Sequence, residues 1–99
     1  MSRTPIHPGE ILKDELNGIG MSAAELARQL CVPENRISEV IRGRRNITAD
    51  TALRLGRWFG TSAGFWMNLQ KRYELRRAEQ TCSADIKKIR PRATMAIST

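Results

Sequence analysis

The amino-acid sequence predicts an all-α fold of five helices, and three observations lead to this prediction. Apolar residues recur at the helical spacing i, i+3, i+4 and i+7 in several successive segments. Residues typical of helix N-caps precede these segments, and glycines follow most of them. No segment keeps the strict alternation of a β-strand for long enough to form one.

The first helix is predicted to begin at Pro8 and to run to about Asn17. Proline is tolerated in a first helical turn, because the N–H group that it lacks would have no partner there. Gly18 and Gly20 are expected to end the helix. The residues expected on its buried side are Leu12, Leu16 and Ile19.

The second helix is marked at its start by a capping box. Ser22 is a good N-cap, and Glu25 stands three residues further on. The small alanines in its apolar stripe allow another helix to approach closely. This stripe consists of Ala23, Leu26, Ala27 and Leu30, and the helix is expected to stop at residues 30–32.

A third helix is predicted between Pro33 and Gly43, because proline suits a first turn and glycine suits the position after a last turn. Its expected buried residues are Ile37, Val40 and Ile41. Successive side chains are about 100° apart around a helix, so polar residues occupy the opposite side. They are Asn35, Ser38, Glu39 and Arg42, and a basic loop follows at residues 44–47.

Two further helices are predicted before a basic tail. Thr48 caps the fourth, which ends before Gly60 and buries Ala52, Leu55, Gly56 and Phe59. Ser62 caps the fifth, which is expected to last to about Glu79. Apolar residues are scattered beyond this point and basic residues surround Pro91. We therefore expect a folded domain over residues 1–79 and a basic tail of low order over residues 80–99.

Length and composition limit the possible functions. A chain of 99 residues forms one small domain with little interior for a substrate, and no motif with catalytic spacing is present, so an enzyme is not expected. The two cysteines and His7 form no metal-binding pattern, and no metal or cofactor is expected. His7 is expected to cap or pack. No membrane span or signal pattern is present, so the cytoplasm is the expected location.

The formal charge of +7 is unevenly distributed along the chain. Residues 1–30 carry a net charge of −1, residues 31–60 carry +3 and residues 61–99 carry +5. A basic region suits a polyanionic partner such as nucleic acid. The acidic front and the basic rear therefore imply different partners.

Residues 22–43 have the arrangement that is required to read a DNA major groove. Two short helices flank a short turn, and the second buries one side while it shows hydrogen-bonding groups on the other. Asn can bind adenine, Glu can accept from cytosine and Arg can bind guanine, and the exposed side offers Asn35, Glu39 and Arg42. A solvated helix face has a similar composition, but the basic loop that follows favours DNA binding.

Several motifs in the chain resemble those of a known family. Residues 21–44 resemble the helix-turn-helix of the Xre and phage-repressor class. The motifs HPGEIL at residues 7–12, ITADTALRL at 47–55 and FWMNLQ at 65–70 resemble a HigA-type antitoxin. The resemblance covers residues 5–76 and implies a lambda-repressor-like domain, usually a homodimer. It also implies a protein that binds double-stranded operator DNA, represses its own operon and neutralises a HigB-like, mRNA-cleaving toxin.

The resemblance further implies which residues contact DNA. The positions that face base edges are Pro33, Glu34, Asn35 and Glu39, and those that flank them are Arg36, Ser38 and Arg42. Phosphate contacts are implied for Ser22, Arg44 and Arg45. Cys31 stands where the family usually has a glycine with positive φ, and a rebuilt turn at this position would move the third helix.

Two further surfaces are expected. A toxin that holds RNA must be basic, so we expect it to contact the acidic side of the first helix, at Glu10, Asp14 and Glu15. Most aromatic residues are expected in the core, but a domain this small cannot bury all of them. A two-fold dimer is therefore expected to use some of the fifth helix, at Phe65, Trp66, Leu69 and Tyr73.

Two other interpretations of the sequence remain open. The chain is compatible with a solitary Xre-type regulator that has no toxin partner, and a neighbouring toxin gene would distinguish the two. The net charge and the basic tail are also compatible with a small RNA-binding protein. Binding to duplex DNA and to RNA at the same salt concentration would separate this interpretation from the others.

Overall fold

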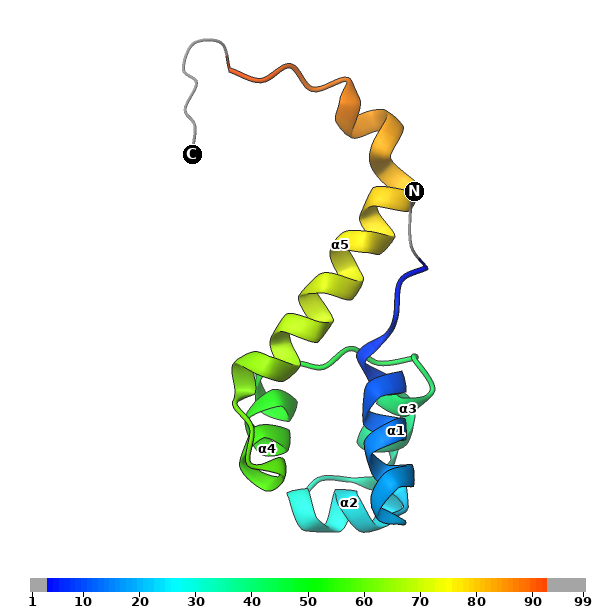
Figure 1. Ribbon diagram of the computed structural model, residues 1–99, viewed down its shortest axis with the longest axis vertical. Coiled ribbons are helices and arrows are strands. Elements are labelled where there is room, and N and C mark those ends of the chain that lie inside the picture. The colour runs from blue at the N-terminus through cyan, green and yellow to red at the C-terminus, as the bar shows by residue number, and fades with distance from the viewer. Residues whose placement is uncertain (1–3, 93–99) are drawn as a thin grey trace.

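The computed structural model describes residues 4–92, and within them it contains five α-helices and no strand. The helices are α1 (Pro8–Ile19), α2 (Ala23–Leu30), α3 (Glu34–Ile41), α4 (Ala49–Phe59) and α5 (Ala63–Lys87). Helix α5 begins beside α4 and also contacts α1, and its later part extends away from the other four helices (Figure 1). The predicted all-α fold is confirmed.

Two of the predicted N-cap side chains form the expected hydrogen bonds, whereas Thr48 stands at the N-cap of α4 without a side-chain capping hydrogen bond. Ser22 Oγ accepts a hydrogen bond from the N–H of Glu25 at 3.1 Å, and Glu25 Oε1 accepts one from the N–H of Ser22 at 2.9 Å. Ser62 Oγ accepts in the same way from the N–H of Phe65 at 3.1 Å. Glycines with left-handed backbone conformations follow α1, α3 and α4, at Gly20, Gly43 and Gly60.

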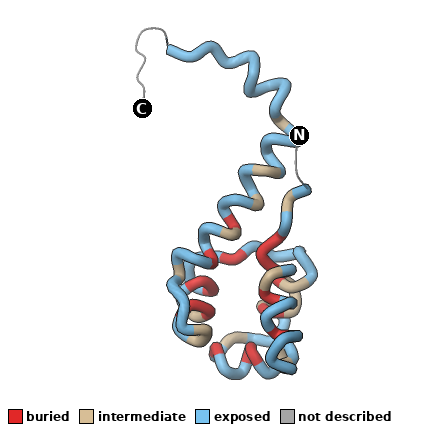
Figure 2. Tube along the Cα trace, viewed as in Figure 1, coloured by how far each residue is buried: buried red, intermediate tan, exposed pale blue. Residues whose placement is uncertain are grey.

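The core lies between the first four helices and the beginning of α5 (Figure 2). Its members are Leu12, Leu16, Leu26, Ala27, Leu30, Ile37, Val40, Ile47, Ala52, Leu55 and Trp66. The backbones of α1 and α3 approach closely at Gly9, where a Cβ atom would lie 1.9 Å from the Val40 carbonyl oxygen. Helix α1 is therefore fixed directly against the last turn of α3.

The end of α1 differs from the prediction. The helix continues through Gly18 to Ile19, and the chain then reverses at Gly20, which has a φ of 69°. Ile19 was expected to be buried, and that prediction is wrong, because its side chain is 54% exposed. It is the last helical residue, and the chain turns away immediately after it.

Helix α5 is longer than predicted. It runs past Glu79 to Lys87, so the expectation of low order is corrected over residues 80–87. These residues include neither glycine nor proline, and helical hydrogen bonding therefore continues without a buried face until the chain approaches Pro91. Residues 88–92 of the predicted tail follow without helical structure, and residues 93–99 lie outside the described residues. None of the helices in residues 4–92 is both long enough and apolar enough to cross a membrane.

Candidate nucleic-acid interface

The turn between α2 and α3 determines the position of α3. Cys31 adopts the left-handed conformation usually taken by glycine, with a φ of 61°. Backbone hydrogen bonds close the turn, from Cys31 N–H to the Arg28 carbonyl at 3.2 Å and from Val32 N–H to the Ala27 carbonyl at 3.0 Å. The cysteine therefore keeps the turn in the glycine conformation, at a backbone cost of about 1–2 kcal/mol.

The burial of Ile37 and Val40, each 0% exposed, fixes the side of α3 that faces outward. Asn35 lies on the opposite side and is exposed, whereas Arg36 and Ser38 lie on the two flanks and are half-buried. Glu39 is also half-buried, and the remaining predicted contacts are exposed, namely Ser22, Pro33, Glu34, Arg42, Arg44 and Arg45. Every predicted DNA-contacting side chain is therefore at least partly accessible.

Two of the predicted DNA contacts are paired with each other. Arg45 Nε and Nη2 both donate to Glu39 Oε1, at 3.2 and 3.0 Å. The backbone N–H groups of Arg44 and Arg45 donate to the Glu39 carbonyl at 2.9 and 3.2 Å, which holds the basic loop against the end of α3. The side chains of Arg42 and Arg44 have no acidic partner within residues 4–92. These two arginines are therefore free to meet a polyanion.

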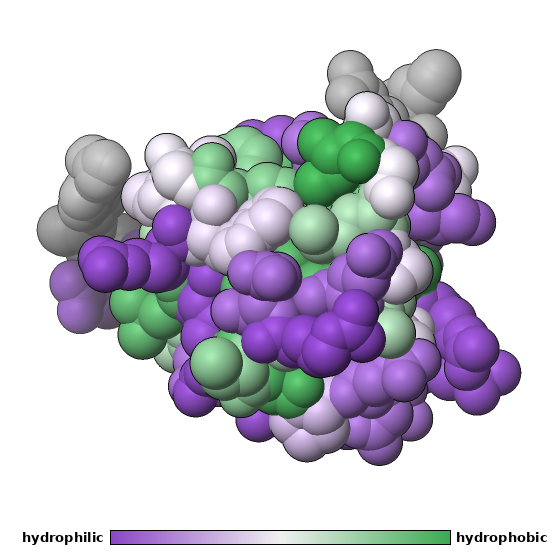
Figure 3. Space-filling model, turned by 90° about the horizontal axis from the view of Figure 1, so that it is seen from below, coloured by the Kyte–Doolittle hydropathy of each residue, from purple (hydrophilic) through white to green (hydrophobic). Residues whose placement is uncertain are grey.

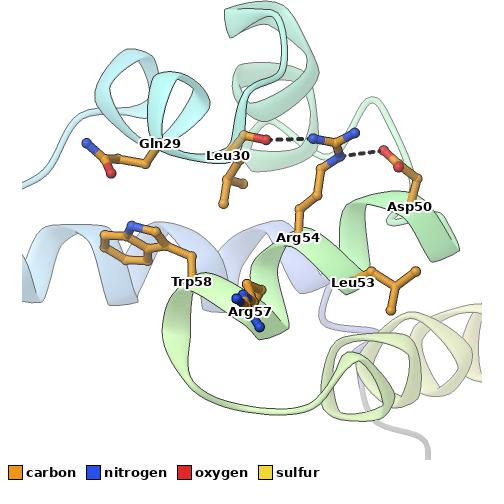
Figure 4. A pocket seen from close by; sticks show the side chains of 7 residues that line it. All are labelled: Gln29, Leu30, Asp50, Leu53, Arg54, Arg57 and Trp58. Carbon is orange, nitrogen blue, oxygen red and sulfur yellow. Dashed lines mark hydrogen bonds and ion pairs between the residues drawn. The ribbon is translucent and has the colours of Figure 1, made fainter.

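A group of polar contacts that the sequence interpretation missed connects α2, α3 and α4. Asp50 Oδ2 accepts from Arg54 Nε at 3.0 Å and also from Arg36 Nη1. Arg54 Nη1 donates to the Leu30 carbonyl at 2.8 Å, at the end of α2 (Figure 4). These hydrogen bonds, first that of Arg54 and then that of Arg36, hold the pKa of Asp50 below its usual range. We name this group, Arg36, Asp50, Arg54 and the Leu30 carbonyl, the Asp50 clamp.

The Asp50 clamp adjoins an open groove of about 510 Å³ between α2 and α4. Gln29 and Trp58 lie near one end of the groove and Leu53, which is 64% exposed, lies near the other (Figure 4). The end of the molecule seen from below shows hydrophilic residues with interspersed apolar ones (Figure 3). No continuous apolar face is visible in that view.

His7 has a structural position, as expected. Its Nδ1 atom accepts from the N–H of Gly9 at 2.9 Å and so caps α1, while its ring packs edge-on against Tyr73 at 4.7 Å. The side chain is buried, and its Nε2 atom has no hydrogen-bond partner among the described residues. Burial lowers the pKa of His7, Glu10 opposes this change and Arg77 adds to it. A neutral ring at pH 7 is what the cap requires, because Nδ1 must accept a hydrogen bond.

The acidic residues that were predicted to contact a toxin lie on the outer side of α1. Glu10, Asp14 and Glu15 are all exposed. None of them forms an ion pair within residues 4–92. Their charges are therefore available to a basic partner.

Trp66 is not available for the predicted dimer contact, because it is only 1% exposed. Its Nε1 atom donates to Thr61 Oγ1 at 3.2 Å, and its ring packs against Phe59 and Phe65 at 5.5 and 5.1 Å. The prediction for Trp66 is wrong for a physical reason. Helical spacing shows which residues share a side of α5, but it does not show which part of that side the same chain covers.

The other apolar residues of α5 keep accessible surface. Phe65 is 43% exposed, and Leu69 and Tyr73 are half-buried beside a hollow of about 170 Å³ that Ile6 also lines. The sequence interpretation missed two exposed residues further along the helix. Leu75 and Ile86, each 58% exposed, are separated by about three helical turns and lie on the same side of α5.

The fold and the outward side of α3 define a helix-turn-helix protein. Residues 12–66 match the family described as Helix-turn-helix. The chain is 55% identical over 76 residues to virulence-associated protein I of Dichelobacter nodosus, and the match covers 76% of this chain and 70% of that protein.

Solved structures narrow the family further. The chain is similar to an addiction module antidote protein of a HigA family from Coxiella burnetii, with 47% identity, a TM-score of 0.88 and coverage of 90% of this chain and 99% of that one. It is also similar to the Pseudomonas aeruginosa antitoxin HigA with the higBA promoter, with 49% identity, a TM-score of 0.85 and coverage of 89% and 98%. The chain belongs to the HigA family of addiction-module antidote proteins.

Proposed function

We propose that the protein is an antitoxin that binds operator DNA as a dimer, represses its own operon and neutralises an mRNA-cleaving toxin. The observation that carries the proposal is the outward side of α3, where Asn35 is exposed, together with Arg42 and Arg44 after the helix, which have no acidic partner within residues 4–92. The Pseudomonas relative, which is solved with its promoter, supports the same use of the fold.

Asn35 is the foremost candidate for reading a base. Its side chain is exposed and an amide can bond bidentately to adenine. Glu39 is a second candidate, but it must first exchange its contact with Arg45, and Arg45 would then be free for a phosphate. Pro33 and Glu34 accompany Asn35 at the start of α3. We assign phosphate or flanking contacts to Ser22, Arg36, Ser38, Arg42 and Arg44.

The toxin contact is assigned to the acidic side of α1. Glu10, Asp14 and Glu15 are exposed and carry no ion pair within the described chain, and a toxin that holds RNA has to be basic. This side is formed by residues other than those assigned to DNA. A toxin bound there would leave α3 available for the operator.

The dimer contact is assigned to α5. Phe65, Leu75 and Ile86 are exposed apolar residues on the helix that extends from the bundle, and a second copy would remove them from water. Leu69 and Tyr73 lie beside the first helix and contribute at the edge of the contact. A two-fold dimer would place two copies of α3 in successive major grooves, about 34–36 Å apart.

Footprinting on the duplex DNA upstream of the protein's own gene tests the proposal. We expect two protected half-sites about one helical turn apart, with affinity that falls steeply as the salt concentration rises. RNA of matched length at the same salt concentration is the comparison that tests the RNA-binding alternative. Equal affinity for unrelated duplex DNA, or tighter binding to the RNA, would contradict operator recognition.

A further inference from the structure

Arg36 lies on the flank of α3 that faces the beginning of α4, and its direction is set by Asp50. The Arg36 Nη1 atom donates to Asp50 Oδ2, and no other partner is found for the guanidinium within the described chain. A guanidinium carries five N–H donors, so most of them remain unused in this contact. Asp50 therefore restrains the Arg36 side chain and leaves most of its N–H donors available.

Asp50 is itself held in place by a second arginine. Arg54 Nε donates to the same Oδ2 atom at 3.0 Å, and Arg54 Nη1 donates to the Leu30 carbonyl at 2.8 Å. The carboxylate is thus connected through Arg54 to the end of α2 (Figure 4) and through Arg36 to the beginning of α3. The two helices on either side of the turn at Cys31 are connected through two side chains of α4, Arg54 and Asp50.

The flanks of a recognition helix face the walls of the major groove, and the walls are formed by the phosphate backbone. A long, freely moving arginine at such a position loses rotamer entropy when it contacts a phosphate. An arginine already restrained by a carboxylate loses less, and its remaining donors suit a phosphate well.

We propose that Asp50 is a positioning residue for DNA binding, which holds the Arg36 guanidinium on the flank of α3 so that its remaining donors meet a phosphate. This inference rests on the proposed function. Arg54 completes the arrangement by fixing Asp50 to the end of α2. Neither Asp50 nor Arg54 has to touch DNA for this role.

The effect of Asp50→Asn on operator affinity distinguishes a positioning role from a simple effect of charge, because the two predict changes in opposite directions. Asp50→Asn removes a negative charge near the DNA-facing side, and charge alone would strengthen binding to every duplex. Positioning has the opposite consequence. We expect Asp50→Asn to weaken operator binding about tenfold and to reduce the slope of log affinity against log salt by about one unit, as for the loss of one phosphate contact.

The experiment measures operator affinity at several salt concentrations for the wild-type protein, Asp50→Asn, Arg36→Met and the double variant. Arg36→Met is expected to match Asp50→Asn, and the double variant is expected to be no weaker than either, because both changes remove the same contact. Asp50→Glu keeps the charge and is expected to recover affinity to within about threefold of the wild type. Asp85→Asn, which removes an exposed carboxylate that pairs with Lys88 at the end of α5, is the matched charge control.

Thermal unfolding of each variant identifies any loss of folding. If Asp50→Asn does not fold, Arg36→Met tests the same contact, provided that its melting temperature equals that of the wild type. Equal or tighter operator binding by Asp50→Asn, or full additivity in the double variant, would overturn the positioning role. In either case the wild-type protein would still bind its operator, and the proposed function would stand. Absence of operator binding by the wild-type protein itself would overturn both.

Discussion

Cys31 shows how a single residue can stabilise or strain the element that carries the function. Its φ of 61° is rare for a residue with a Cβ atom, and two backbone hydrogen bonds keep the turn closed around it. The side chain is exposed, so little packing offsets the backbone cost. The turn holds its shape through these hydrogen bonds and not through the identity of the residue.

Replacing Cys31 with glycine is therefore expected to stabilise the protein. The backbone strain that glycine relieves is larger than the additional entropic cost of ordering glycine on folding. The free energy of unfolding is therefore expected to rise by about 0.5–1 kcal/mol. Urea unfolding of Cys31→Gly measures this gain, and operator affinity is expected to stay unchanged because the turn is not rebuilt. A lower unfolding free energy for Cys31→Gly would show that the cysteine is not strained.

His7 makes the stability of the protein depend on pH. Its folded pKa lies below the ordinary value of 6.5, so the unfolded chain binds the proton more readily in this range. The contribution of His7 to the free energy of unfolding is therefore expected to be complete above pH 6.5 and to be lost as the pH falls through the folded pKa. Protonation also removes the Nδ1 acceptor that caps α1.

Urea unfolding at about pH 7.5 and 5.5, a range that spans the ordinary histidine pKa, measures this effect. His7→Asn keeps a side-chain acceptor for the cap but does not titrate, so it is the matched control. Because the chain has one histidine, we expect most of the pH dependence in this range to disappear in His7→Asn. An unchanged pH dependence would assign the effect to another group.

Among the elements, α5 combines two roles along one helix. Its first half contributes Trp66 and Gln70 to the interior, and Gln70 Oε1 accepts from the N–H of Ile47 at 2.8 Å. Its second half has no buried residue and extends from the bundle. An isolated helical extension gains little from its own hydrogen bonds, so a second copy is the natural source of stabilisation.

The proposed α5 dimer predicts that Leu75→Glu shifts the protein toward the monomer, because the change would place a carboxylate in an apolar contact between two copies. Sedimentation at tens of micromolar measures the change, and Asp85→Asn, on another side of the same helix, is the control. A wild-type protein that sediments as a monomer under these conditions and binds a single half-site with full affinity would exclude the dimer.

The helix caps could be predicted because each depends on residues close in the sequence, as Ser22 and Glu25 show. The outward side of α3 could be predicted for the same reason, from the spacing of Ile37 and Val40. The Asp50 clamp could not, because Arg36 and Asp50 are 14 residues apart and meet only after α4 packs. The end of α5 was missed because helix propensity alone, without an apolar stripe, sustains its last turns.

At the scale of the whole molecule, charge separates two surfaces. The acidic residues of α1 have no ion pair in the described chain, and the basic residues concentrate after residue 31. Reversing Glu10, Asp14 and Glu15 to lysine is expected to slow association with a basic toxin about tenfold or more, because long-range attraction becomes repulsion.

Binding kinetics with the cognate toxin measure this change, and the footprint of the same variant on the operator serves as its control. Unchanged toxin association would show that Glu10, Asp14 and Glu15 do not form the toxin contact. If no toxin binds the wild-type protein while operator binding persists, the protein is a regulator without a toxin partner.

Base selection by Asn35→Ala tests whether the outward side of α3 reads the operator. Selection from random duplexes should show that Asn35→Ala loses preference at one base pair of each half-site, with a cost of about 1–3 kcal/mol on the preferred operator. Arg44→Ala should instead weaken all duplexes alike and reduce the salt slope by about one unit. An unaltered base preference in Asn35→Ala would show that this side of α3 does not read the operator through Asn35.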